Sequence, residues 1–282
     1  MTRSAPRLLL FALFALLPGT LQGAEIVRGQ TALYLFKTHD SVSVTYEGKE
    51  VPLLQHPAKD RHIALIPVDY RTEPGKKRIV VTRNGTPHTL ELRVLDGNYP
   101  SETLKVSPSK VSPDPAQQER IAAEYAEAMA IYRESTPKRY WKSPFAYPMT
   151  SPITSRYGNA RLFNGTLRSY HSGTDFKAAV GTPVHAINDG VVVLAKERFY
   201  AGGSVIVDHG EGLYSCYYHL SRIDVTPGTV VKKGSEVGLS GQSGRVTGPH
   251  LHFSIMFRGV QVAPLQFLEI LNGLFNVKAG HR

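Results

Sequence analysis

Two stretches in the second half of the chain carry the residues best suited to metal chemistry. His171-Ser-Gly-Thr-Asp175 offers an imidazole and a carboxylate, and Pro249-His250-Leu251-His252 offers two further imidazoles. Two imidazoles and one carboxylate are a common zinc ligand set, in which the fourth position is left to water. Because glycine interrupts the first stretch, we expect His171 and Asp175 to lie on a turn or an irregular strand rather than on a helix.

The histidine pair of the second stretch should lie on one face of a strand, because alternate side chains of a strand share a face. Both His250 and His252 could then bind one metal ion, or one could bind it while the other moves protons. His219 is a further candidate for moving protons near the metal ion. An imidazole near a metal is well matched in pKa to general acid–base work. The sequence does not divide that work between His219 and His250.

Other residues near these motifs have simpler interpretations. Tyr218 should point to the opposite strand face from His219 and pack there, and Cys216 should be a buried strand thiol. Arg168 and Tyr170 precede His171 and could approach a substrate. Four of the remaining histidines have no mutual ligand spacing and are interpreted as surface or structural residues: His39, His56, His62 and His88. His185 should face solvent or pack, His209 should be structural, and His281 should lie in the tail.

The first part of the chain reads as a small β-sandwich over residues 25–98. Five β-branched or alternating runs predict strands there, and turn sequences such as Arg83-Asn84-Gly85-Thr86 separate them. The predicted strands cover residues 32–36, 41–46, 63–66, 78–82 and 89–95. Strands of this length and spacing are typical of a sandwich.

A proline-rich connector and one helix, over residues 99–142, follow the predicted sandwich. Asp114 can cap the helix, and Pro115 suits its first turn. Ile121, Tyr125, Ala128 and Tyr132 recur at helical spacing and predict one apolar stripe. We expect this amphipathic helix to pack on one of the two domains that flank it.

Residues 143–272 predict an antiparallel β domain with tight hairpins, and residues 273–282 a tail. Strand runs over residues 191–194, 204–207, 213–219 and 251–257 alternate with glycine-bearing turns. No helical period longer than a turn or two occurs before about Pro264. The domain is therefore expected to bring the three histidine-bearing motifs to one point.

Composition and the first residues indicate an exported protein. A basic start, the apolar run Leu8 to Leu17 and small residues near Ala24 predict a signal peptide over residues 1–24, with no stable membrane anchor after its cleavage. The formal net charge of +10 favours a polyanionic partner. Because the basic residues are scattered and no nucleic-acid module is recognisable, nucleic acid is not expected. The single cysteine excludes an intramolecular disulfide and a cysteine-based zinc site.

The spacing of several blocks resembles the lysostaphin/LytM-type zinc endopeptidase family. These blocks are Arg168 to Phe176, Gly181 to Val184, Asn188 to Val192, Tyr218 to Ser221, Val231 to Gly234 and Gly241 to Phe253. The resemblance covers about 120 residues, all in the C-terminal half. It implies that His171, Asp175 and His252 bind one zinc ion and that His219 and His250 are catalytic.

The resemblance also implies a substrate and a compartment. We expect a zinc-dependent endopeptidase that hydrolyses the peptide cross-links of peptidoglycan, as a D,D-endopeptidase, in the periplasm or elsewhere in the cell envelope. The alternatives are a catalytically silent LytM-like activator of wall amidases, a D,D-carboxypeptidase and a secreted bacteriolysin. Residues 25–98 would dock the enzyme to the wall or to a regulatory protein, or would cover the metal cleft and inhibit it.

Overall fold

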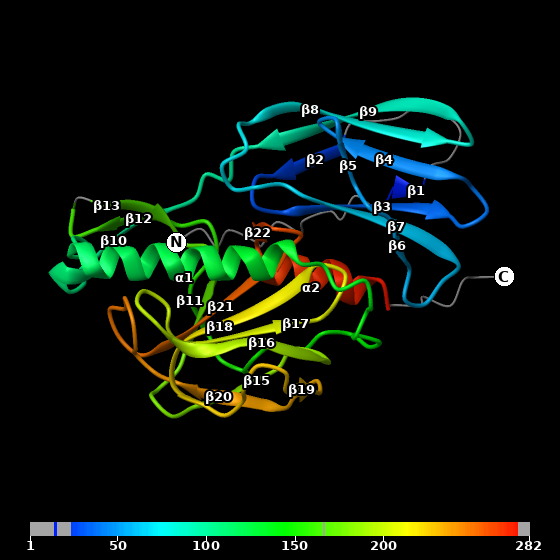
Figure 1. Cartoon of the computed structure of the whole chain (residues 1–282). Helices are drawn as coiled ribbons and strands as arrows, with labels where there is room; N and C mark the ends of the chain where they lie inside the picture. The colour runs from blue at the N-terminus through cyan, green and yellow to red at the C-terminus, as the bar shows by residue number, and fades with distance from the viewer. Residues whose placement is uncertain (1–13, 16–23, 166, 276–282) are drawn as a thin grey trace, which may run out of the picture.

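The computed structural model describes residues 14–15, 24–165 and 167–275, and the fold is mainly β, as the sequence predicts (Figure 1). Most of the predicted signal peptide, the end of the predicted tail and His281 lie outside the described residues. Within the described ranges, no helix combines the length and the apolar character needed to cross a membrane.

The N-terminal half is a two-sheet sandwich, and it confirms the predicted strands. One sheet has the order β1-β3-β7-β6, with bounds Phe14–Ala15, Thr31–Lys37, Arg61–Pro67 and Leu54–Gln55. The other has the order β2-β9-β8-β4-β5, with bounds Ala24–Val27, Thr86–Leu95, Gly75–Arg83, Val42–Tyr46 and Lys49–Glu50. Side chains from both sheets, such as Tyr34 and Ile79, form one buried core.

Strands β3 and β7 are apolar on both faces, which joins the two halves of the molecule. Tyr34 and Ala64 face the sandwich core, whereas Leu35 and Ile63 pack into the core of the second half. This arrangement follows from the two-residue repeat of a strand. Helix α2 (Pro264–Gly273) lies between the sandwich and the C-terminal sheet, below β3 in Figure 1.

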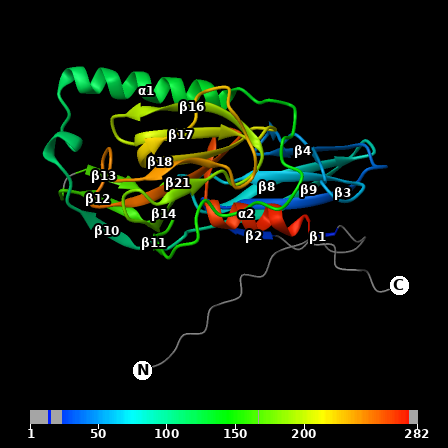
Figure 2. The same ribbon diagram turned by 90° about the horizontal axis from the view of Figure 1, so that it is seen from below.

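The segment between the halves is more than a connector. Strand β10 (Ser101–Leu104) pairs in parallel with β12 (Ala160–Phe163), which forms a hairpin with β13 (Leu167–Tyr170), as Figure 2 shows. A single 3₁₀ turn, η1 (Pro108–Lys110), follows. Residues expected to link two domains therefore supply an edge strand to the second one.

Helix α1 (Pro115–Arg133) begins where the sequence predicts. Asp114 accepts a hydrogen bond from the backbone of Gln117 in a capping box. Ala128 and Tyr132 are buried as expected, but the prediction is wrong for Tyr125, which is 65% exposed. The carboxylate of Glu124 accepts a hydrogen bond from the backbone of Phe199 instead, so the helix turns this polar residue toward the sheet.

The C-terminal half is built on a ten-stranded antiparallel sheet with the main order β11-β14-β21-β18-β17-β16-β19. The bounds are Ile153–Ser155, Thr174–Lys177, His250–Phe257, Leu213–Ile223, Gly202–Asp208, Gly190–Arg198 and Val230–Val231. Three further strands extend it: β15 (Pro183–His185), β20 (Glu236–Ser240) and β22 (Val260–Val262).

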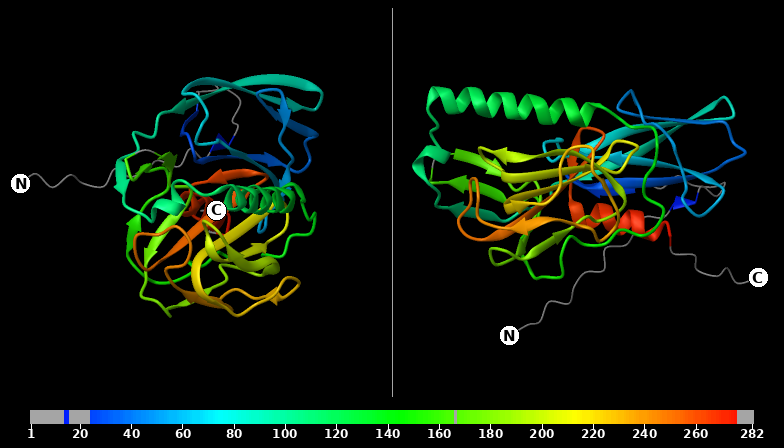
Figure 3. Two further views of the ribbon diagram at one scale, coloured as in Figure 1. Left: turned by 60° about the vertical axis from the view of Figure 1, so that its left-hand side comes forward. Right: turned by 60° about the horizontal axis from the view of Figure 1, so that its bottom comes forward.

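Each face of this sheet is covered by a different helix. Helix α1 packs on Ile206, Tyr214 and Cys216, whereas residues of α2 share a core with Tyr217 and Phe253 on the other face (Figure 3). The prediction that Cys216 is a buried thiol is confirmed. The α1 side of strands β14, β18 and β21 is the face that carries the predicted ligand residues.

Candidate metal centre

His171, Asp175 and His252 converge on one point. The Nε2 atom of His171 lies 2.9 Å from Oδ1 of Asp175 and 3.0 Å from Nδ1 of His252, and the last two atoms lie 2.9 Å apart. All three side chains are buried. Within the described residues, they are the one group of His, Cys, Asp and Glu whose ligand atoms could hold a metal ion.

Strand register and one glycine explain this convergence. Asp175 on β14 pairs directly with His252 on β21, so both side chains leave the sheet on the same face. His171 reaches them from the short turn that precedes β14, as the sequence predicts. A Cβ atom at Gly173 would lie 2.5 Å from Nε2 of His252, so this turn can approach β21 closely only without a side chain there.

The donor atoms of this group fit a bound cation. Nδ1 of His171 lies 2.8 Å from the carbonyl oxygen of Arg156, which can only accept, so Nδ1 carries the proton. The lone pair of Nε2 then faces the carboxylate of Asp175, and a positive charge between them satisfies both atoms. Ligand atoms of a tetrahedral zinc site lie roughly 3.3 Å apart, close to the spacing here.

The electrostatics of the group keep its carboxylate ionised. Burial raises the pKa of Asp175, but its contacts with the rings of His171 and His252 hold it well below its ordinary value. Burial lowers the pKa of His252 to about 4, against the opposing effect of Asp175. At neutral pH the site therefore presents a carboxylate and a neutral imidazole, which are the protonation states that bind a metal.

His219 and His250 lie beside this group. Nδ1 of His219 donates to the carbonyl of Ser243, and Nδ1 of His250 donates to the carbonyl of Gly248, each at 2.8 Å. The two rings are 4.9 Å apart, and Nε2 of His250 is 3.7 Å from Oδ1 of Asp175. In a neutral imidazole with Nδ1 protonated, Nε2 is the free acceptor. The structure thus places two proton acceptors next to His171, Asp175 and His252, which we call the ligand group.

The backbone of His219 is unusual and decides where its ring points. Its φ is +65°, in the left-handed region that residues with a side chain rarely adopt. The regular pairing of β18 with β20 is interrupted just after it, between Leu220 and Arg222. Regular strand alternation would direct the His219 side chain to the other face of the sheet. The local break brings it to the face that carries His252. Burial, with smaller effects of His252 and His250, lowers the pKa of His219 well below its ordinary value.

The expectation that Tyr218 points to the opposite face from the site is wrong. Tyr218 is the register partner of His252, and the two rings stack with centroids 5.6 Å apart and an interplanar angle of 11°. The bend at His219 breaks the alternation on which that expectation depended. The Tyr218 hydroxyl also lies 3.3 Å from that of Tyr132 on α1, so the residue packs as well as flanking the site.

The residues before His171 meet the N-terminal sandwich. The ring of Tyr170 stacks on that of Tyr70, with centroids 3.9 Å apart and an interplanar angle of 5°. The guanidinium of Arg71 lies 5.4 Å from the centre of the Tyr170 ring. Tyr170 is thus packed between the halves of the molecule. The side chain of Arg168 lies outside the described residues.

Two residues that the sequence did not single out contact the ligand group. Arg161 on β12 donates to Oδ2 of Asp175 at 2.8 Å, and the hydroxyl of Ser155 lies 3.0 Å from Nδ1 of His171. The turn residues Asn164 and Gly165, both with positive φ, were a readable hairpin signal that places β12 beside β13. Nothing in the sequence shows that a β12 side chain reaches Asp175.

The other described histidines take no part in the group. His209 is fully buried; its Nδ1 donates to the carbonyl of Asp189 at 2.8 Å, and its Nε2 lies 2.8 Å from the Ser215 hydroxyl. This is the structural role that the sequence predicts. Burial lowers the pKa of His209 to about 4. His185, at the end of β15, is half-buried, and its backbone donates to Pro148.

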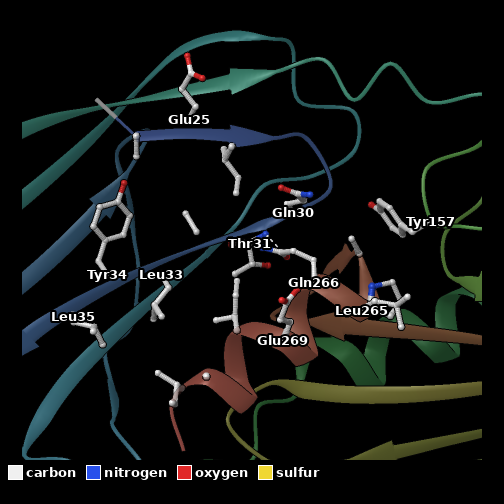
Figure 4. A pocket seen from close by; sticks show the side chains of 18 of the residues that line it. Glu25, Gln30, Thr31, Leu33, Tyr34, Leu35, Tyr157, Leu265, Gln266 and Glu269 are labelled. Carbon is white, nitrogen blue, oxygen red and sulfur yellow. Dashed lines mark hydrogen bonds between the residues drawn. The ribbon is translucent and has the colours of Figure 1, made fainter. Parts of the chain in front are cut away.

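A separate cavity of about 710 Å³ lies where the sandwich meets α2 (Figure 4). Its walls come from β2, β3, α2 and Tyr157, and none of the five predicted site residues lines it. Two lining residues contact each other: the side chain of Gln266 on α2 accepts a hydrogen bond from the backbone amide of Thr31 and donates one to its carbonyl. These bonds satisfy the backbone groups of the first residue of β3.

Comparisons with known proteins agree with this geometry. Residues 169–264 match the family described as Peptidase family M23. The chain is 46% identical over 116 residues to "Peptidoglycan DD-endopeptidase ShyA" of Vibrio cholerae, a match that covers 40% of this chain and 27% of that protein. It is 38% identical over 123 residues to "DD-carboxypeptidase/endopeptidase Mpg" of Neisseria gonorrhoeae, covering 44% and 26% respectively.

A solved structure resembles nearly the whole chain. A crystal structure from Pseudomonas aeruginosa, described as a peptidase M23, superposes with a TM-score of 0.65 at 29% identity and covers 88% of this chain and 96% of that one. The chain spans only about a quarter of the length of the curated relatives it matches. With the convergent ligand group inside the matched segment, residues 169–264 of this chain are a peptidase M23 domain of the LytM type.

Proposed function

We propose that the chain is a zinc-dependent endopeptidase that hydrolyses peptide cross-links of peptidoglycan. The observation that carries this proposal is the convergence of His171, Asp175 and His252 within 3.0 Å of one another, inside a peptidase M23 segment. These residues would hold one zinc ion, which supplies Lewis acidity to a water and to the substrate carbonyl when bound.

The protein's own side chains would handle the protons. Because Nδ1 of both His219 and His250 is held by a carbonyl, each ring presents Nε2 to the same space beside the ligands. The lowered pKa keeps His219 neutral near pH 7, so it can accept a proton from the attacking water. His250, whose side chain is 16% exposed, is then placed to donate a proton to the leaving amine.

The bond that we propose is the D,D cross-link between stem peptides. Three Vibrio cholerae relatives carry the name peptidoglycan DD-endopeptidase. The formal net charge of +10 suits a substrate whose stem peptides bear carboxylates, and an envelope location follows from that substrate. The second candidate is a D,D-carboxypeptidase, because the Neisseria relatives are named for both activities.

Digestion of purified sacculi by the full chain tests this proposal. We expect mass spectrometry of the muropeptides to show cross-linked dimers converted to monomers, and a zinc chelator to abolish the conversion. Loss of terminal D-alanine without loss of dimers would favour the carboxypeptidase. A folded protein that binds zinc but releases no amine termini would favour the silent amidase activator.

For residues 25–98 we propose a fixed docking platform for the wall or for a regulatory protein. Leu33, Leu35 and Ile63 pack into the core of the C-terminal half, so swinging the sandwich away would expose apolar surface. Tyr70→Ala removes the ring stacked on Tyr170 and should leave turnover of a soluble cross-linked peptide within about twofold. A large rise in turnover would instead support the inhibitory alternative.

A further inference from the structure

A carboxylate from the connector lies behind the ligand group. Glu102 is on β10, outside the matched segment, and its register partner on β12 is Arg161. Alternate residues of β10 are half-buried, and Glu102 is one of these, with its side chain 24% exposed. The parallel pairing of β10 with β12 therefore directs this acidic side chain toward the site.

The carboxylate of Glu102 accepts hydrogen bonds from three side chains. Its Oε1 accepts hydrogen bonds from the Ser155 hydroxyl at 2.8 Å and from the side-chain amide of Asn159. Its Oε2 accepts from Nε of Arg161 at 3.3 Å. Although burial raises the pKa of Glu102, these hydrogen bonds lower it below its ordinary value. The residue is thus a fixed anion.

Two of these partners touch the ligand group directly. Nη2 of Arg161 holds Oδ2 of Asp175 at 2.8 Å, which leaves Oδ1 facing the two imidazoles. The Ser155 hydroxyl lies 3.0 Å from Nδ1 of His171, on the side of the ring opposite the ligand atom. Such outer hydrogen bonds fix the orientation of metal ligands.

The positive charge of Arg161 gives a negative residue a role at this place. Arg161 is a cation in contact with a proposed zinc ligand, and its charge alone would oppose the binding of a second, doubly charged cation. An anion on its far side offsets that repulsion and keeps the guanidinium aligned with Asp175. Glu102 occupies this position, with the Arg161 side chain only 15% exposed between it and Asp175.

We propose that Glu102 is a positioning residue of the metal centre, which holds Arg161 and Ser155 so that Asp175 and His171 present their ligand atoms to one point. The M23 segment is then incomplete without the strand that precedes it. This inference rests on the proposed zinc group and extends it to a residue that the family match does not include.

Zinc affinity of the full chain, measured by competition with a chromophoric chelator, tests the proposal. Glu102→Gln keeps the side-chain volume and an acceptor for Ser155 but removes the charge, and we expect its zinc Kd to rise about tenfold or more. Glu25→Gln is the matched control, because Glu25 also pairs with an arginine, Arg93 at 3.0 Å, but on the surface of the sandwich. Its zinc Kd should equal that of the wild type.

A double variant separates positioning from general destabilisation. In an Arg161→Gln background, Glu102→Gln should change the zinc Kd by less than about threefold, because the cation that the carboxylate offsets is absent. An unchanged Kd for Glu102→Gln alone, or an equal loss in both backgrounds, would overturn the inference. Failure of the wild type to bind zinc would overturn the proposed function as well, so the two failures are distinguishable.

Discussion

The glycine of the His171-Ser-Gly-Thr-Asp175 stretch gives a sharp test of how the candidate metal centre is built. A Cβ atom at Gly173 would lie 2.5 Å from Nε2 of His252 and 2.5 Å from the backbone oxygen of Phe253. Real Cβ contacts are essentially never closer than 3.0 Å, so in Gly173→Ala something must move by about 0.5 Å, the difference between these distances. The backbone of β21 is fixed by two neighbouring strands, so the shift falls on His252 and on the turn before β14.

This displacement is large for a metal site and modest for the fold. Ligand distances in a metal centre hold to within roughly 0.2 Å, so we expect the zinc Kd of Gly173→Ala to rise by at least about tenfold. Overpacking of a buried site costs roughly 1–3 kcal/mol in the free energy of unfolding. The effect on zinc should therefore be seen in a protein that is still folded.

The assay is chelator competition on the full chain, with urea unfolding of the metal-free protein alongside it. Gly273→Ala is the control, because it makes the same substitution at the end of α2, where nothing lies within 4 Å of the new Cβ. Both substitutions lower the conformational entropy of the unfolded chain equally, so this contribution to the free energy of unfolding cancels in the comparison. Equal zinc Kd values and equal unfolding free energies for the two variants would refute the close approach of the Gly173 turn to β21.

Three further predictions follow from buried groups. Asp175→Ala should lose stoichiometric zinc in elemental analysis. His219→Ala should retain zinc and lose turnover by about 100-fold or more, because we propose that the His219 ring accepts a proton from the attacking water; full activity of His219→Ala would remove that role. Cys216 is buried and burial raises its thiol pKa, so a thiol reagent should label it only after unfolding, and rapid labelling of the native chain would contradict the structure. His209 has a pKa of about 4 when folded and an ordinary value of 6.5, so below pH 6.5 the unfolded state binds the extra proton. Stability should therefore be full above pH 6.5 and fall by roughly 3 kcal/mol toward pH 4. Urea unfolding across this range should show a shallower pH slope for His209→Gln than for the wild type, and equal slopes would exclude this residue as the cause.

Local patterns in the sequence determined the elements and much of the candidate site. The two-residue repeat predicted β3 and β7, and the Asp114-Pro115 pair predicted where α1 begins. The same repeat placed His250 and His252 on one face of a strand. These signals were sufficient because alternation and capping depend on the backbone conformation of a few neighbouring residues.

The tertiary structure alone decided how the site is completed. The positive φ of His219 reverses the alternation that misplaced Tyr218, and no residue type in that stretch signals it. Glu102 meets Arg161 through a parallel pairing of strands that are 59 residues apart in sequence. Which strands become neighbours depends on the burial of apolar surface across the whole chain. The sequence therefore identifies the candidate ligand residues, and the packing of distant segments determines the charges and hydrogen bonds that surround them.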